Sequence, residues 1–204
     1  MTPRSGRRRL TRDRIVAVAL DLIERHGHDA LSLRSLAAEL EVTAPALYDH
    51  VDGKDDLLRA VAVVGYDDLA ERSADAARLV SSTATGPSAG AALARCRSGA
   101  RAYVDYATER PELFRTMLRY RPAAVPADDD NELAAATVFF ERGLDDLRQA
   151  IADGDLVDRD PVDLSLTIWA ATHGVATIAL VAPEVAKQVA DDVIEAVFTG
   201  LRPG

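Results

Sequence analysis

Apolar residues recur every three or four positions along most of the chain, which is the spacing of an amphipathic helix. Residues 12–26 are an example, because Ile15 and Ile23 share one face between Thr11, a good N-cap, and Gly27, a common C-terminal stop. No stretch alternates apolar and polar residues over the length of a strand. The pattern therefore predicts an all-α fold.

Residues 32–51 carry two short helical patterns separated by a tight turn. Ser32 can cap the first helix and Thr43 the second. Pro45 falls in the first turn of the second helix, where its missing N–H costs nothing. With Leu47 turned toward the core, the second helix presents small and polar residues at its N-terminal end. This arrangement is typical of a helix-turn-helix unit that reads DNA.

The residues after this unit add to the prediction. Asp52-Gly53 is typical of a turn, and Lys54 opens a long helix to about Val80, whose first N–H groups and lysine can hold a phosphate. Between Leu10 and about Leu58 the chain thus orders a helix, a helix-turn-helix and a lysine-opened helix, with the motif Leu47-Tyr48-x-His50-Val51 before Lys54. This block resembles the N-terminal domain of the tetracycline-repressor (TetR) family.

The resemblance implies which residues meet DNA. The residues expected in or beside the major groove are Arg34, Thr43, Ala44, Pro45, Ala46 and Tyr48. His50 and Lys54 are expected at phosphates. Two positions depart from the family pattern: Glu41 stands where members usually carry glycine, and Asp49 puts a negative charge near DNA. If the turn needs a positive φ, Glu41 strains it by roughly 1 kcal/mol.

Charge is divided unevenly along the chain, although the net charge is −9. Residues 1–14 hold six arginines against one aspartate, whereas residues 61–204 hold 14 basic and 23 acidic residues. The arginines can track phosphates or enter a minor groove, or they can form a solvated tail. We therefore expect a flexible arginine-rich arm (1–10), a helix-turn-helix domain (11–58) and a helical regulatory and dimerisation domain (59–204).

The rest of the chain is predicted to be helical as well, with helices at about 91–108, 112–120 and 131–153 and loops at 81–90 and 121–130. Cys96 is the only cysteine, so no intrachain disulfide is possible and its most common role is packing. No apolar signal segment follows the N-terminal arginines. These features predict a cytoplasmic protein.

The last two predicted helices, at about 161–181 and 184–201, are the most apolar. Residues 164–182 contain no charge, but their serines, threonines, histidine and glycine argue against a membrane span and favour a helix buried on every side. Two such helices from each subunit would form a four-helix interface. The sequence thus predicts a homodimer. Its two-fold axis would let two helix-turn-helix units read two half-sites on DNA.

Trp169 and His173 are one turn apart on the first of these helices. The segment Trp169-Ala-Ala-Thr-His173-Gly174 is similar to the Trp-x-x-x-His-Gly signature of one class of TetR regulatory domains. His173 can be a core histidine satisfied by a carbonyl or tyrosine, or an anchor in an effector pocket. The candidate pocket residues are Tyr103, Phe114, Met117, Phe140, Trp169 and His173. A metal site is the least favoured interpretation, since only His26 and His28 lie near each other in sequence, and no metal is expected.

These observations predict a transcriptional repressor that binds double-stranded operator DNA and is released by a small-molecule effector. The alternative is a helical protein-interaction module whose DNA-binding head is degenerate. An enzyme is not expected, because the sequence shows no Ser-His-Asp arrangement, phosphate loop or cysteine-histidine pair. No cofactor and no membrane association are expected either.

Overall fold

The computed structural model describes residues 9–83, 90–120 and 134–204, and within them every regular element is helical. In chain order these are α1 (Arg12–His26), the short 3₁₀ helix η1 (His28–Ala30), α2 (Leu33–Glu39), α3 (Ala44–Leu47), α4 (Lys54–Thr83), α5 (Ala91–Glu109), α6 (Pro111–Arg119), α7 (Ala134–Ala152), α8 (Pro161–Ala179) and α9 (Pro183–Gly200). The predicted all-α fold is confirmed.

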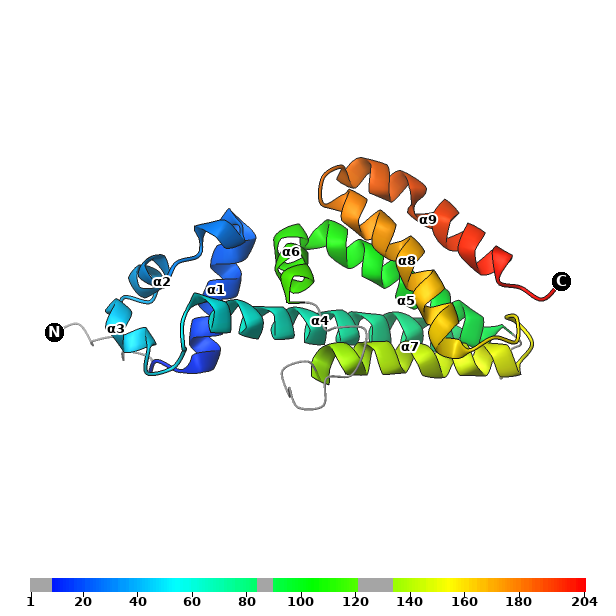
Figure 1. The fold of residues 1–204 in the computed structure, drawn as a ribbon, viewed down its shortest axis with the longest axis horizontal. Helices are drawn as coiled ribbons and strands as arrows, with labels where there is room; N and C mark the ends of the chain where they lie inside the picture. The colour runs from blue at the N-terminus through cyan, green and yellow to red at the C-terminus, as the bar shows by residue number, and fades with distance from the viewer. Residues whose placement is uncertain (1–8, 84–89, 121–133) are drawn as a thin grey trace.

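Figure 1 shows two parts joined by α4. We call residues 12–53, which contain α1, α2 and α3, the reading head, and α5–α9 the body. The long helix α4 starts at the reading head and runs on through the body, where α5 and α7 lie along it. Any tilt of α4 therefore affects the reading head and the body together.

Local sequence explains the helix ends in the reading head. The Thr11 hydroxyl accepts a hydrogen bond from the Arg14 N–H, and Gly27 ends α1 with φ 81°. Ser32 and Ser35 form a reciprocal capping box at the start of α2. The helix α3 is shorter than the pattern predicts: it ends at Leu47, and only turns follow, as far as His50. Thr43 stands at its N-cap position, but no cap hydrogen bond from this hydroxyl is found in the described structure.

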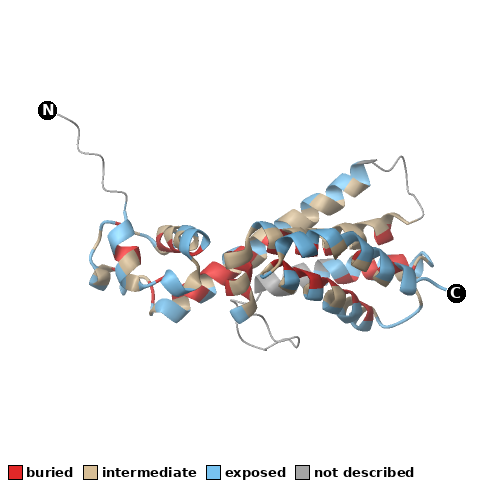
Figure 2. Cartoon of the chain, turned by 90° about the horizontal axis from the view of Figure 1, so that it is seen from above, coloured by how far each residue is buried: buried red, intermediate tan, exposed pale blue. Residues whose placement is uncertain are grey.

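The buried apolar residues of the described segments form two cores. The larger core runs without a break from α1 and α2 of the reading head, along α4 and the second half of α5, to α6, the end of α8 and the start of α9. The smaller core lies at the far end of the body, among α5, α7, α8 and α9. Figure 2 shows the buried positions on the inward sides of the helices in both parts. The continuous larger core explains why the reading head does not hang from a flexible linker.

The predicted boundaries in the body agree with the structure to within a few residues. α4 continues to Thr83, three residues beyond the predicted end, and α8 begins at Pro161 after Asp160, whose carboxylate accepts from the N–H groups of Val162 and Asp163. Gly154 has φ 77° where the helix before it is predicted to stop. The start predicted for that helix at about residue 131 and the loop at 121–130 lie outside the described residues.

Candidate DNA-binding head and effector cavity

The second helix of the helix-turn-helix presents its N-terminal end to solvent. Thr43, Pro45 and Tyr48 are exposed, with 59% of Tyr48 accessible, whereas Leu47 is fully buried against the reading-head core. Ala44 and Ala46 are half-buried between these two sides. Apart from the tyrosine ring, the side chains on this surface are small, which suits close approach to base edges and phosphates.

The other predicted DNA-binding residues lie around this surface. Arg34 is exposed on α2, and Lys54 is exposed as the first residue of α4. His50 is half-buried in the turns after α3. At the start of α4 the first-turn N–H groups and Lys54 share one end of a helix, an arrangement that favours an anion.

Glu41 occupies the turn between α2 and α3 with φ 55°. Among the described residues it is the one non-glycine with positive φ, so the turn does require the left-handed conformation that glycine adopts without strain. The backbone bonds around it hold the geometry, since the N–H of Val42 donates to the Ala37 carbonyl at 2.9 Å. The reading head therefore keeps the turn and carries the strain of a side chain there.

Arg12 braces the reading head. Its guanidinium donates to both carboxylate oxygens of Asp56, at 2.8 and 2.6 Å, and to the His50 carbonyl at 3.0 Å. Asp56 also accepts from the Asp52 N–H at 3.0 Å. Hydrogen bonding by Arg12 holds the pKa of Asp56 below its usual value. Three segments that must keep a fixed relation, the start of α1, the exit of α3 and the start of α4, are thus joined by one side chain.

Sequence reasoning misses this brace, because it counts Arg12 among the positive charges that face DNA. Arg12 and Asp56 are 44 residues apart, so no local pattern pairs them. Charge counting alone cannot separate an arginine that faces DNA from one that a carboxylate already holds.

A cavity of about 520 Å³ opens in the body, bounded by α4, α5, α7 and α8 and by Phe198 of α9. Its walls are mainly apolar and include Ala74, Cys96, Tyr103, Leu147 and Trp169. Burial raises the pKa of the Cys96 thiol to about 12, so the thiol stays protonated at neutral pH. A volume of this size suits a small organic molecule.

The charged residues at the cavity are held by partners within the chain. Arg95 pairs with Asp146 at 2.7 Å, Arg78 pairs with Asp75, and Asp145 pairs with Arg148 at 2.7 Å. Arg95 and Asp146 are mostly buried, so a charged ligand would have to break their ion pair to use either charge. The other two pairs are exposed and weaker, but they still balance the charges of Arg78 and Asp145. The charges of the arginines and aspartates around the cavity therefore balance one another.

An aromatic cluster connects the cavity to the core. The Trp169 and His173 rings stack with centroids 4.6 Å apart, and the Tyr103 hydroxyl lies 3.0 Å from His173 Nδ1. Phe114 meets the Tyr103 ring edge-on at 5.4 Å. His173 therefore has a tyrosine as its hydrogen-bond partner, as one of the two interpretations of this histidine expected. This contact does not depend on whether the ring also binds a ligand.

The six predicted pocket residues do not all reach the cavity. Tyr103 and Trp169 line it, whereas Phe114, Met117 and His173 are not among its lining residues. Phe114 and Met117 are buried in the larger core instead, because α6 turns its apolar face toward α1 and α4. Phe140 belongs to α7, but its side chain lies outside the described part of the structure. The wall residues from α4 and α7 escape sequence reasoning, since they are mostly small alanines or ion-paired side chains.

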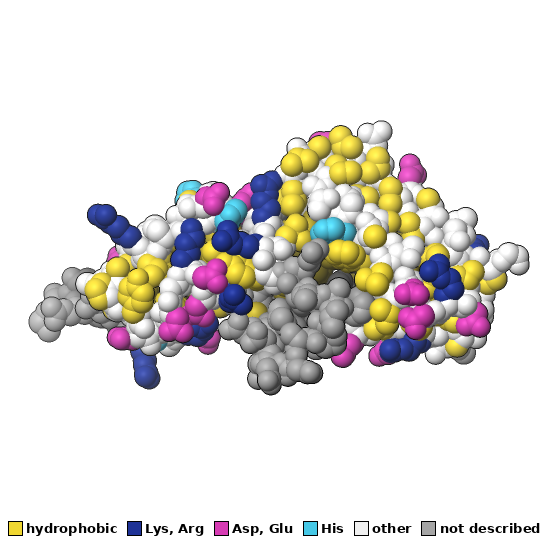
Figure 3. All heavy atoms as spheres, in the orientation of Figure 1, with side chains coloured by type: hydrophobic (Ala, Val, Ile, Leu, Met, Phe, Trp, Pro, Cys, Tyr) yellow, Lys and Arg dark blue, Asp and Glu magenta, His cyan; other side chains and the backbone are white. Residues whose placement is uncertain are grey.

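The helix α8 is not buried on every side, in contrast to the sequence-based expectation. One face carries exposed apolar side chains that continue into the start of α9, namely Val162, Leu166, Ile178, Val181 and Val185. Figure 3 shows hydrophobic side chains gathered over α8 and the first turns of α9. We call these five residues the α8 face. Among the described residues of the single chain, nothing covers this uncharged face.

Two family matches cover most of the described chain. Residues 15–61 match the family described as bacterial regulatory proteins, tetR family, and residues 96–201 match a tetracyclin repressor-like C-terminal domain. The first lies on the reading head and the start of α4, and the second on the body. The chain therefore belongs to the TetR family of DNA-binding transcriptional regulators.

Individual relatives agree with this assignment. The chain is 30% identical to an HTH-type transcriptional regulator of Mycobacterium tuberculosis, Rv0681, over 95% of this chain and 78% of that protein. It is similar to a solved protein from Rhodococcus sp. RHA1, with a TM-score of 0.77, 25% identity and coverage of 99% and 100%. It also shares the fold of the TetR-family regulator PfmR of Thermus thermophilus, with a TM-score of 0.65, 22% identity and coverage of 96% and 100%.

Neither of the two family matches identifies the class of TetR regulatory domain to which the body belongs. The resemblance of residues 169–174 to the Trp-x-x-x-His-Gly class remains a prediction.

Among the described helices, none combines the length and the apolar character that crossing a membrane requires.

Proposed function

We propose that the chain is a repressor that binds a palindromic operator as a homodimer and leaves it when a small, largely apolar molecule enters the body cavity. The observation that carries the proposal is the exposed N-terminal end of α3, where Thr43, Pro45 and Tyr48 face solvent over a buried Leu47. A helix that offers small side chains at its N-terminus, beside an exposed Arg34, suits entry into the major groove.

Dimerisation is part of the proposal because one reading head covers only one half-site. The α8 face supplies the apolar surface for a partner, and a second copy of the chain would bring an identical uncharged face around a two-fold axis. The paired faces would fix the distance between the two reading heads. Operator spacing then follows from dimer geometry.

Release follows from linkage between the cavity and the reading head. An occupant that favours a different tilt of α4 favours a different spacing of the two heads, and so weakens operator binding by the difference in its affinity for the two states. The paired charges at the cavity favour an uncharged effector. Tyr103 and Trp169 offer it flat apolar surface.

DNA binding is tested by selecting bound duplexes from a random pool with the purified chain. The enriched sequence should be a palindrome whose half-site centres are about 10 base pairs apart, or a multiple of that spacing. Arg34→Ala and Tyr48→Ala should each weaken binding about 10-fold in fluorescence anisotropy, since a base contact contributes about 1–3 kcal/mol. Glu195→Ala, on the distant α9, is the control. A pool without enrichment would favour the alternative of an interaction module with a degenerate head.

Effector chemistry is tested through Trp169, the only tryptophan in the chain, which lines the cavity. Three probes of equal chain length, 1-decanol, decanoate and decylammonium, are titrated while tryptophan emission is followed. The uncharged alcohol should give the lowest midpoint and should release the selected operator. A lower midpoint for either charged probe would reject the uncharged class of effector while leaving DNA binding untouched.

A further inference from the structure

Arg110 stands where the body meets the reading head, between α5 and α6. Its backbone is fixed on both sides, because its N–H donates to the Tyr106 carbonyl and its carbonyl accepts from the Phe114 N–H, both at 2.9 Å. Pro111 follows directly and restricts the backbone further. The guanidinium therefore projects from a rigid corner of the molecule.

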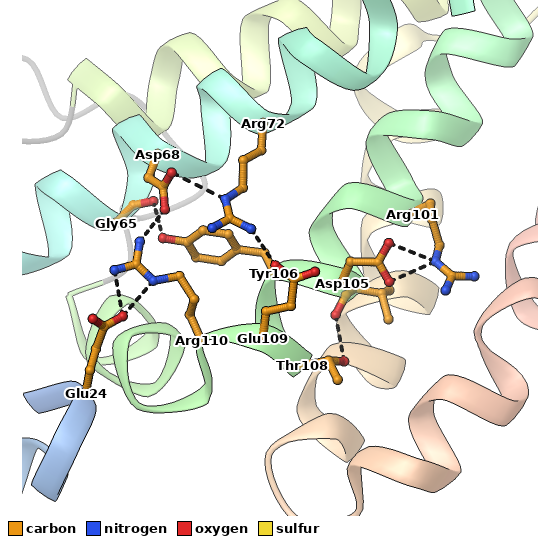
Figure 4. Close-up of polar contacts among 11 residues, drawn as sticks. Glu24, Gly65, Asp68, Arg72, Arg101, Asp105, Tyr106, Thr108, Glu109 and Arg110 are labelled. Atoms are coloured by element: carbon orange, nitrogen blue, oxygen red, sulfur yellow. Dashed lines mark hydrogen bonds and ion pairs between the residues drawn. The ribbon is translucent and has the colours of Figure 1, made fainter. Parts of the chain in front are cut away.

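On the body side, the Arg110 guanidinium is held by α4 and α5. It pairs with Asp68 of α4 and lies 5.9 Å above the Tyr106 ring of α5. Tyr106 is fully buried, and its hydroxyl donates to the Gly65 carbonyl of α4 at 3.0 Å. Arg72 completes the cluster by pairing with Asp68 at 3.3 Å, as Figure 4 shows. These contacts lock the register between α4 and α5.

On the head side, the same guanidinium holds α1. Its Nε donates to Glu24 Oε1 at 2.6 Å, and a second guanidinium nitrogen lies 2.6 Å from the same oxygen. Glu24 belongs to the last turns of α1, and Figure 4 shows it opposite Asp68 with Arg110 between them. One planar cation thus joins a carboxylate of the reading head to a carboxylate of α4. The forked donors of arginine fix direction as well as distance.

The cavity lies next to this cluster along the same two helices. Tyr103 lines the cavity one turn before Tyr106 on α5, and Ala70 and Ser73 line it on either side of Arg72 on α4. A molecule that changes the separation of α4 and α5 at the cavity would therefore move the two helices that anchor Arg110. The displacement would reach Glu24 through one side chain.

We propose that Arg110 is the positioning residue that sets the angle of the reading head relative to the body, through its simultaneous grip on Glu24 and Asp68. The inference deepens the proposed function, on which its operator readout rests. Its geometric readout needs neither DNA nor effector.

The angle is measured as a distance between two spin labels on one chain. Cys96→Ser removes the native thiol, and cysteines at exposed Ala38 on α2 and exposed Ala152 on α7 report on head and body. Labelled chains are diluted into an excess of unlabelled full-length chains, so that distances between subunits do not contribute. Glu24→Gln and Arg110→Gln should each broaden the head-to-body distance distribution at least twofold, and the double variant should broaden it no further.

Asp191→Asn is the matched control, because Asp191 pairs with Arg101 between two helices of the body. It should leave the distribution unchanged. Arg110→Lys keeps the charge but cannot serve both carboxylates with a planar fork, so its distribution should be intermediate in width. Glu24→Gln should also lower the affinity for the selected operator three- to tenfold. The melting temperature of this variant should stay within a few degrees of that of the Asp191→Asn variant.

Unchanged distributions in both Glu24→Gln and Arg110→Gln would overturn the proposal. If Arg110→Gln fails to fold, Glu24→Gln decides alone, since Glu24 lies on the surface of α1. The two proposals can fail separately. If the unaltered chain binds no operator but Glu24→Gln still broadens the distance distribution, the proposed function is rejected and Arg110 remains the positioning residue.

Discussion

Single side chains in the reading head divide into those that face solvent and those that hold helices together. Arg34, Tyr48 and Lys54 are exposed, whereas Arg12 is tied to Asp56 and to the carbonyl of His50. The distinction matters because only a side chain facing outward can neutralise a phosphate. A side chain that holds helices together contributes to stability instead, and the two roles separate in different measurements.

Lys54→Ala should weaken binding to all DNA sequences alike and reduce the slope of log affinity against log salt by about one unit per lost phosphate contact. The reason is that each phosphate neutralised by a cation releases condensed counterions. Lys187→Ala is the matched control, because Lys187 is exposed on α9, far along the chain from the reading head. A slope equal to that of the unaltered protein would remove Lys54 from the DNA interface.

Asp56 gives the reading head a pH dependence. Its pKa is lowered in the folded chain, so its contribution is present above the unfolded value of about 3.9 and is lost as the pH falls through the folded value. Asp56→Asn should reduce the free energy of unfolding by about 1 kcal/mol at pH 7, and the gap should shrink below about pH 4. Urea unfolding at pH 7, 5, 4 and 3 measures it. Asp49→Asn, on the exposed surface of the same head, is the control, and a gap as large at pH 3 as at pH 7 would contradict the assignment.

At the scale of elements, α6 is placed by a close approach to α4. Gly65 of α4 has no room for a side chain, because an added Cβ would lie 2.6 Å from Met117 Sδ and 3.2 Å from Leu113 Cδ1. The Tyr66 hydroxyl donates to the Met117 carbonyl at 3.1 Å beside this contact. The glycine lets the Met117 and Leu113 side chains of α6 pack directly against the α4 backbone, and so keeps α6, which follows Arg110, close to α4.

Gly65→Ala should therefore cost about 1–3 kcal/mol of unfolding free energy, although alanine has the higher helix propensity. Gly99→Ala in α5 is the control, since an added Cβ there meets nothing within 4 Å. In a Met117→Ala background, where the clashing side chain is absent, the further loss of stability caused by Gly65→Ala should be smaller than in the unaltered chain. Denaturant unfolding checks these variants, and equal stability of the two glycine variants would contradict the tight contact.

Helix positions and ends were largely predictable because their causes are local. Caps such as Ser32 and Asp160 and the stop at Gly27 lie within a few residues of the bonds they make. Long-range partners were not predictable from pattern, since Arg110 and Glu24 are 86 residues apart. The lining of the cavity was hard to predict for a related reason. An apolar helix face indicates burial, but the neighbouring helices decide whether that face packs in a core, as Met117 does, or lines a cavity.

The whole molecule raises the question of what covers α8. A sequence without charge predicts burial, and in the single chain Val181 remains 82% exposed and Val185 49%. By contrast, Val193 and Val197 of α9, which the pattern also assigns to the interface, pack partly against the chain's own cores. Charges at Val193 or Val197 would therefore mix a folding defect with an assembly defect. The exposed positions give the cleaner test.

Ile178→Asp and Val181→Asp should convert a dimer to a monomer in sedimentation, because each would bury an unpaired carboxylate in an apolar interface. Helix content should stay nearly unchanged, since both side chains face solvent within the chain. Leu79→Asp is the matched control, because Leu79 is an exposed apolar residue of α4 outside the α8 face. The monomeric variants should bind a single half-site weakly and lose the tight binding of the palindrome. A dimer that keeps palindrome affinity with aspartate at position 178 or 181 would place the two-fold contact on another surface and would separate operator spacing from α8.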